Sequence, residues 1–130
     1  MILDTSAVIA ILRNESEAMR FAELIEAADQ RRISAVNYVE AAAVIESNRD
    51  PIASRRFDEL LREAEVRIEA VTVKQARLAR EAYRDFGKGS KHKAKLNFGD
   101  CFAYALAKDL SEPLLFKGDD FVHTDIEAAR

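Results

Sequence analysis

The sequence predicts an α/β protein in which a short, mainly parallel sheet of four or five strands lies between two layers of helices. Short apolar runs at 1–3, 33–36, 66–71 and 113–116 are typical of strands. Longer segments with apolar residues at helical spacing separate these runs. Because strands that alternate with helices pair in parallel through right-handed crossovers, we expect a three-layer α/β/α sandwich.

Each expected helix has a local start signal. The helices are expected at about 7–12, 17–28, 37–48, 51–65, 73–86 and 97–107, and a short final strand at 124–126. Asp50 precedes Pro51, the usual arrangement of a capping residue followed by proline at the first helical position. Ser16, Asn37, Thr72 and Asn97 are the expected N-caps of four other helices.

Length and composition are those of one folded domain, which we expect to span residues 1–130. The uncharged stretches are far shorter than the ~20 apolar residues of a transmembrane helix, so we expect no membrane-spanning segment. No basic segment precedes the apolar start, so we also expect no signal peptide. The single cysteine, Cys101, excludes an internal disulfide and favours a cytoplasmic location.

Asp4 follows the first strand directly and has two interpretations. In open α/β sheets, ligands bind at the carboxyl ends of the strands, and Asp4 would lie at such an end. Aspartate is also a preferred N-cap, so Asp4 would cap the helix that follows. This segment alone favours the cap, and the other acids of the chain bear on the choice.

Three further segments bring acids to the same predicted edge of the sheet. Glu40 and Asp100 each stand three residues after an asparagine, so each would lie in the first turn of a helix. Asp119 and Asp120 follow the last apolar strand. A capping box or the helix dipole explains any one acid in a first turn. Several acids in one cleft would repel one another, however, and a bound cation removes that cost.

Magnesium suits such a cluster, because Mg²⁺ takes oxygen ligands and is commonly held by one or two carboxylates together with substrate phosphates. Carboxylates with Mg²⁺ or Mn²⁺ can activate water for in-line displacement at phosphorus. The net charge of −3 argues against a general polyanion binder, but residues 74–95 carry eight Lys and Arg against two acids. That basic segment suits either contact with phosphates or a solvated surface.

Four segments of the chain resemble the PIN-domain ribonucleases and, among these, the VapC toxins of bacterial toxin–antitoxin pairs. The segments are MILDTSA, NYVEAA, LNFGDCFAYALA and LLFKGDDFVHTDI, and together they extend over the whole chain. The resemblance implies a PIN-like fold and a Mg²⁺-dependent endoribonuclease, with Mn²⁺ as a possible substitute, that cleaves RNA, often tRNA or rRNA, and arrests translation. It also implies a homodimer that a cognate VapB-type antitoxin neutralises.

The resemblance also implies roles for individual residues. Asp4, Glu40 and Asp100 match the metal-binding acids of the family, with Asp4 and Asp100 as direct Mg²⁺ ligands. Glu40 would bind through water or assist in activating it. Ser6 matches the hydroxyl residue that orders the acidic pocket.

The last of the four motifs departs from the family pattern. Many relatives have a threonine followed two residues later by an acid, and here Phe116 and Gly118 stand at those positions. We assign the fourth acidic role to Asp119, with Asp120 as the alternative.

Two other functions are compatible with the sequence. The chain could be a catalytically silent PIN-fold module that binds an antitoxin or nucleic acid, although it keeps all three of the matched acids. A phosphatase or phosphotransferase would use Asp4 as phosphoryl acceptor. The usual acceptor signature has a second aspartate two residues later, and here that position is Ser6.

Overall fold

The computed structural model describes all 130 residues and contains four strands and six helices. The strands are β1 (Ile2–Leu3), β2 (Arg31–Ser34), β3 (Val66–Glu69) and β4 (Leu114–Leu115). The helices are α1 (Thr5–Leu12), α2 (Ala18–Ala27), α3 (Ala35–Glu46), α4 (Pro51–Glu63), α5 (Val73–Phe86) and α6 (Phe98–Leu110). None of the helices is both long and apolar enough to traverse a bilayer.

The four strands form one parallel sheet in the order β3-β2-β1-β4. The predicted α/β class and mainly parallel sheet are therefore confirmed. The strand expected at 124–126 does not form, and only Ala128 makes a single bridge to Leu114. The reason is local, because the Thr124 hydroxyl and N–H both donate to the carbonyl of Phe121 at 2.7 and 3.0 Å and close a turn there.

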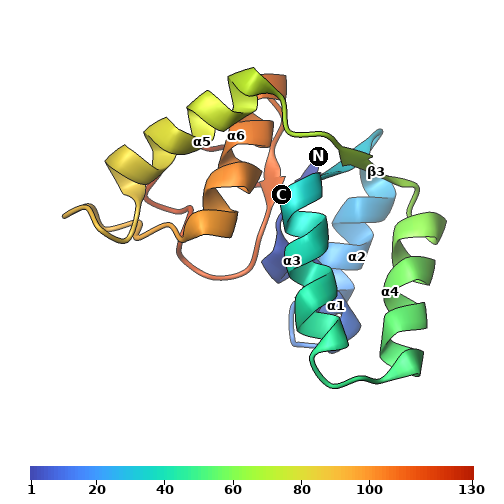
Figure 1. Cartoon of the computed structure of the whole chain (residues 1–130). Helices are drawn as coiled ribbons and strands as arrows, with labels where there is room; N and C mark the ends of the chain where they lie inside the picture. The colour runs from blue at the N-terminus through green and yellow to red at the C-terminus, as the bar shows by residue number, and fades with distance from the viewer.

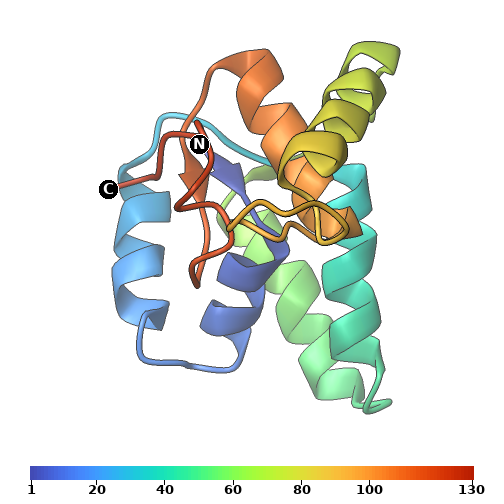
Figure 2. The ribbon, with the colours of Figure 1, turned by 90° about the vertical axis from the view of Figure 1, so that its left-hand side faces the viewer.

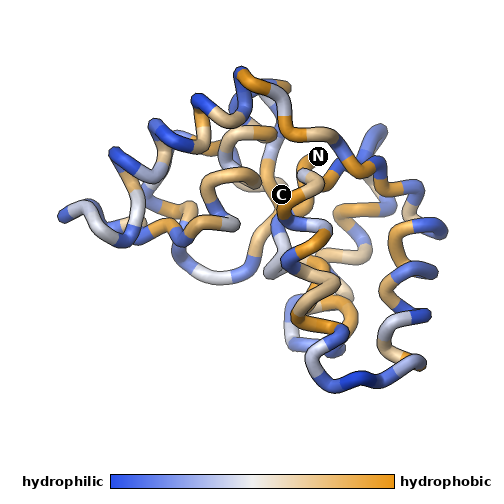
Figure 3. The backbone as a smooth tube through the Cα atoms, in the orientation of Figure 1, coloured by the Kyte–Doolittle hydropathy of each residue, from blue (hydrophilic) through white to orange (hydrophobic).

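Helices cover both faces of the sheet, and successive strand residues point to opposite layers. Ile2 and Leu114 belong to the apolar cluster formed with α5 and α6, whereas Leu3 and Leu115 belong to the cluster formed with α1–α4. The ribbon shows the α5–α6 pair on one side of the strands and the other four helices on the opposite side (Figures 1 and 2). Hydrophobic segments run through the middle of the molecule (Figure 3).

Two of the predicted helix starts are wrong. β2 begins two residues earlier than expected and ends at Ser34, which is paired with Glu69 of β3. Ser34 then caps α3 by accepting from the N–H of Val36 at 3.3 Å, so Asn37 lies inside the helix and is not its N-cap. Glu17, not Ser16, precedes α2, because the Ser16 hydroxyl donates to the Glu17 carboxylate and caps no backbone N–H.

The remaining start signals are confirmed by side-chain bonds to the backbone. Asp50 accepts from the N–H of Ile52 at 2.9 Å, with Pro51 at the first helical position. Thr72 accepts from the N–H of Gln75 at 3.1 Å at the start of α5. These signals act within four residues, which is why the sequence alone reveals them.

Candidate active site

Both interpretations of Asp4 from the sequence hold: it lies at the end of a strand and it caps a helix. Its N–H bonds to the carbonyl of Leu115 at 2.9 Å, which places it at the carboxyl edge of β1 and β4. It is also the N-cap of α1, because Oδ2 accepts from the N–H of Ser6 at 3.0 Å. The cap uses only Oδ2. The other carboxylate oxygen, Oδ1, is buried and has no hydrogen-bond partner.

The environment of Asp4 makes its negative charge costly. Burial raises the pKa of Asp4 to about 6, and the charge of Glu40 acts in the same direction. Hydrogen bonds from Ser6 oppose this rise in pKa but do not cancel it. A buried carboxylate with one unpartnered oxygen is a suitable ligand for a cation, which would supply the missing positive charge.

Asp100 lies in the first turn of α6, where the sequence predicted it, and closes a capping box with Asn97. The N–H of Asp100 donates to Asn97 Oδ1 at 2.8 Å, and Asp100 Oδ2 accepts from the N–H of Asn97 at 3.0 Å. The pKa of Asp100 is raised to about 7, mainly by burial and in addition by the charges of Asp4 and Asp120. Asp100 is therefore electrostatically coupled to acids at the ends of β1 and β4.

Glu40 projects from α3 toward the first turns of α1 and α6. The hydroxyl of Thr5 donates to Glu40 Oε1 through a very short contact, and Asn37 Nδ2 lies 3.5 Å from the same oxygen. A Cβ on Gly99 would lie 2.0 Å from Glu40 Oε2, so this oxygen is packed against the backbone of α6. The structure therefore gathers Asp4, Glu40 and Asp100, which we call the acidic site.

Ser6 connects the acidic site to the segment after β4. Its hydroxyl donates to Asp4 Oδ2 at 2.5 Å and accepts from the N–H of Lys117 at 2.9 Å. Gly118 follows with a φ of +96°, a conformation that residues with a Cβ rarely adopt. Asp119 and Asp120 follow this turn and are both exposed, and Asp120 lies near enough to act on Asp100.

The acids at 119 and 120 differ in their relation to Asp100. Asp120 is among the main causes that raise the pKa of Asp100, whereas Asp119 is not among them. The assignment of the fourth acidic role to Asp119 stays a prediction, and this relationship supports the alternative, Asp120.

The donors of the acidic site fit a divalent cation that prefers oxygen. No three carboxylate, imidazole or thiolate side chains converge on one point as a complete metal shell. A magnesium-like ion needs fewer, because it is commonly held by one or two carboxylates and completes its shell with water and phosphate oxygens. The unpartnered Oδ1 of Asp4 is the observation on which this fit depends.

Sequence reasoning missed the contributions of three residues. Thr5 and Asn37 bond to Glu40, and Gly99 leaves the space that the Glu40 carboxylate occupies. The sequence indicates Asn37 only as an N-cap and indicates no site role for Thr5 or Gly99. Their roles depend on contacts between α1, α3 and α6, for which the local sequence carries no signal.

The basic segment forms an exposed surface next to α6. Lys91, Lys93 and Lys95 are exposed and make no ion pair, whereas Ala94 and Leu96 between and beyond them are buried. His92 packs edge-on against Phe86, with ring centroids 4.8 Å apart, and its Nδ1 accepts from the N–H of Ala94 at 3.1 Å. His92 thus anchors this loop while the lysines face solvent.

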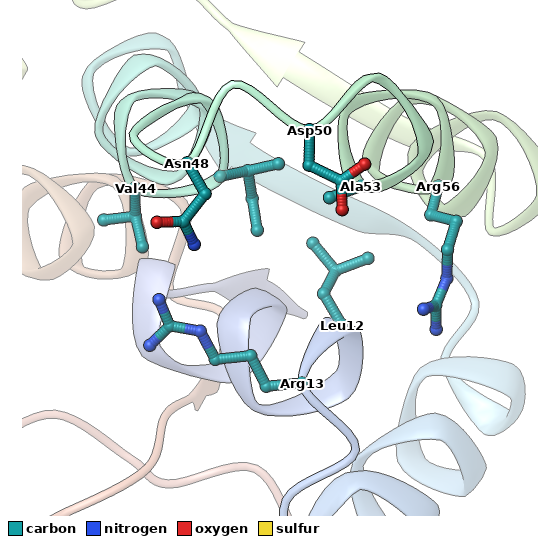
Figure 4. Close-up of a pocket in the computed structure, with 8 residues that line it drawn as sticks. Leu12, Arg13, Val44, Asn48, Asp50, Ala53 and Arg56 are labelled. Carbon is teal, nitrogen blue, oxygen red and sulfur yellow. The ribbon is translucent and has the colours of Figure 1, made fainter.

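A separate pocket of about 130 Å³ lies at the far end of α1 from Asp4. Leu12 points into the space between α3 and α4, with Arg13 and Arg56 extending on either side of it (Figure 4). Val44, Ile45 and Ala53 add apolar surface. None of the acids of the acidic site lines this pocket.

Comparison with known proteins places the chain in a family. The PIN domain model matches residues 1–127. Ribonuclease VapC28 of Mycobacterium tuberculosis is 58% identical over 129 residues, which cover 99% of this chain and 97% of that protein. Ribonuclease VapC42 of the same species is 50% identical, with 99% and 98% covered.

Two solved structures share the fold. VapC20 of Mycobacterium tuberculosis, described as a sarcin–ricin loop cleaving toxin, superimposes with a TM-score of 0.76 at 16% identity and covers 99% of this chain and 98% of its own. A toxin–antitoxin complex from Klebsiella pneumoniae gives a TM-score of 0.72 at 18% identity, with 95% and 92% covered. With the identities to the ribonucleases and the geometry of the acidic site, these findings show that the chain belongs to the PIN-domain family and, within it, to the VapC ribonuclease toxins.

Proposed function

We propose that this VapC ribonuclease is a Mg²⁺-dependent endoribonuclease, with Mn²⁺ able to replace Mg²⁺, and that Asp4 and Asp100 are the direct metal ligands. The observation that carries the proposal is the buried Asp4 carboxylate, whose Oδ1 has no partner and whose charge raises the pKa of Asp100. Glu40 and an acid of the 119–120 turn complete the catalytic set.

The residues of the chain prepare the site for a phosphodiester. When bound, the cation supplies charge neutralisation and a lowered pKa for an attacking water. Ser6 holds Asp4 Oδ2 and so directs Oδ1 away from the cap. Thr5 donates to Glu40 Oε1 and so fixes that carboxylate beside the first turn of α6.

The substrate we propose is RNA of the translation machinery, tRNA or rRNA, whose cleavage in the cytoplasm arrests translation. The exposed lysines at 91, 93 and 95 support this assignment, because they carry no compensating acid and can neutralise backbone phosphates. VapC20, which shares this fold, is described as a sarcin–ricin loop cleaving toxin, and this description supports the proposal.

A VapB-type antitoxin is the proposed protein partner. The solved toxin–antitoxin complex with the same fold supports it. The pocket beside Leu12 has an apolar floor, and its edges carry Arg13, Arg56 and one acid, Asp50, which suits an amphipathic segment with both apolar and charged residues (Figure 4). We also propose a homodimer, since Val39 and Phe98 are 62% and 70% exposed and would be buried by a second copy.

Cleavage of total RNA by matched wild-type and Asp100→Asn proteins, both free of antitoxin, tests the proposal. Wild-type protein should cut RNA with Mg²⁺ or Mn²⁺ and not with EDTA, and the variant should not cut in either condition. Equal cutting by both proteins would indicate a contaminating nuclease. Failure of both to cut any RNA would favour the catalytically silent module that binds an antitoxin.

A further inference from the structure

Asn37 is fully buried in the first turn of α3 and touches all three helices that carry the acidic site. Its relative exposure is 0%. Its Nδ2 lies 3.0 Å from the carbonyl of Gly99, 3.4 Å from Thr5 Oγ1 and 3.5 Å from Glu40 Oε1. One side-chain nitrogen thus reaches α1, α3 and α6.

The hydrogen bonds around Asn37 can be assigned a donor and an acceptor each. The amide has two hydrogens, and the shorter contact assigns one of them to the Gly99 carbonyl. The other is shared between Thr5 Oγ1 and Glu40 Oε1. The Thr5 hydroxyl has two acceptors, Glu40 Oε1 and, at 3.3 Å, the backbone carbonyl of Asn37, and Glu40 is the closer of the two. Thr5 therefore accepts from the Asn37 amide and donates mainly to Glu40.

Each group that Asn37 contacts is an acid or stands next to one in the chain. Thr5 follows Asp4, Gly99 precedes Asp100, and Glu40 is itself a member of the acidic site. A change in the position of Asn37 would therefore alter all three carboxylates together. The Asn37 Oδ1 is buried without a protein partner, an arrangement that costs stability.

We propose that Asn37 is the positioning residue of the acidic site: it ties α1 and α6 to α3, so that Asp4, Glu40 and Asp100 are already assembled when the cation binds. The inference rests on the metal site proposed above. Groups that hold metal ligands in place typically change metal affinity when they are removed, without binding the metal themselves.

The test compares Asn37→Ala with Glu46→Ala, a truncation to alanine at an exposed position on the same helix, α3. Circular dichroism verifies folding, calorimetric titration with Mg²⁺ measures affinity, and steady-state kinetics on RNA separates kcat from KM. We expect Asn37→Ala to weaken Mg²⁺ binding about tenfold or more and to lower kcat with little change in KM. Glu46→Ala should match the wild type.

The readouts distinguish a positioning role from simple loss of stability. A merely structural Asn37 would lower Tm equally with and without Mg²⁺, whereas a positioning Asn37 also reduces the rise in Tm that Mg²⁺ causes. A folded Asn37→Ala protein that binds Mg²⁺ like the wild type would overturn the inference and leave the proposed function intact. Failure of the wild type to bind Mg²⁺ would instead overturn the metal site itself.

A second variant keeps the inference testable if Asn37→Ala does not fold. Thr5→Val retains the shape of the side chain and removes the hydroxyl between Asn37 and Glu40. It should also weaken Mg²⁺ binding by itself, a result that needs no Asn37 variant. Where Asn37→Ala does fold, the Thr5→Val/Asn37→Ala double variant should lose less than the sum of the two single losses, because both act through Glu40. Unchanged Mg²⁺ affinity in Thr5→Val would contradict the proposal that Asn37 positions Glu40 with the help of the Thr5 hydroxyl.

Discussion

The Glu40 carboxylate occupies the space in which a side chain at position 99 would begin. A Cβ on Gly99 would lie 2.0 Å from Glu40 Oε2 and 2.6 Å from Oε1. Because Gly99 precedes Asp100, the close approach of α3 to the first turn of α6 also sets the distance between two acids of the acidic site. Glycine at this position is thus a requirement of the site.

Gly99→Ala should impair the enzyme by displacing Glu40 or the start of α6. We expect activity to fall about 100-fold, since a misplacement of about 1 Å in a catalytic group has that order of effect. Tm should also fall, because neither the helix backbone nor the buried end of Glu40 can move freely. RNA cleavage and thermal unfolding measure the two effects.

Gly89→Ala is the matched control for this substitution. A Cβ on Gly89 meets nothing within 4 Å, and Gly89 lies in an exposed loop. This variant should keep wild-type activity and stability. Full activity in Gly99→Ala would show that Glu40 need not lie against α6.

Asp100→Asn should stabilise the metal-free protein while it abolishes activity. The buried Asp100 carboxylate is held near Asp4 and Asp120, and removing its charge relieves that repulsion. The asparagine oxygen can still accept from the N–H of Asn97, so the helix cap is kept. In EDTA at neutral pH, we expect the free energy of unfolding from urea titration to rise by about 2 kcal/mol. A variant less stable than the wild type would contradict this account.

The stability of the metal-free protein should depend on pH through the same carboxyls. Folding raises the pKa of Asp4 from 3.8 to about 6 and that of Asp100 from 3.8 to about 7. Between the unfolded and folded pKa values the folded state binds more protons, so the free energy of unfolding contributed by these groups decreases as pH rises from about 4 to about 7. Urea unfolding in EDTA across this range measures the decrease.

The difference between wild type and Asp100→Asn isolates this effect from the other titrating groups. The stability advantage of the variant should be small near pH 4 and largest above pH 7. Mg²⁺ binds the ionised carboxylates, so the stabilisation that it gives the wild type should increase over the same pH range. An advantage that is independent of pH would show that the Asp100 charge is not its source.

Separate Asp119→Asn and Asp120→Asn variants decide the fourth acidic role. Asp120 raises the pKa of Asp100, so Asp120→Asn should lower that pKa and reduce cleavage by about tenfold or more. Asp119→Asn should reduce cleavage less. NMR titration of Asp100 and the cleavage rate at saturating Mg²⁺ measure the two effects. A greater loss of cleavage in Asp119→Asn would support Asp119, the residue to which the sequence analysis assigned the fourth acidic role.

The sequence predicted the features whose causes are local. The capping box of Asn97 and Asp100 needs only residues within one helical turn, and the cap and proline at Asp50 and Pro51 are adjacent. The parallel sheet was predicted from the alternation of strand-like and helix-like segments along the chain. Each segment carries its own apolar pattern, so this prediction needs no tertiary contact. The motif resemblance then identified Asp4, Glu40 and Asp100 as one set.

The tertiary structure decided everything that depends on distance across the fold. In the sequence Asn37 looks like a cap because it precedes a helix-forming segment. Pairing of β2 with β3 ends the strand at Ser34, however, so the helix starts earlier in the chain than predicted. Only packing of α3 against α6 then buries Asn37 and places Glu40 against Gly99. Such contacts join residues about 60 positions apart, and their energies depend on burial and proximity, which a local sequence pattern does not encode.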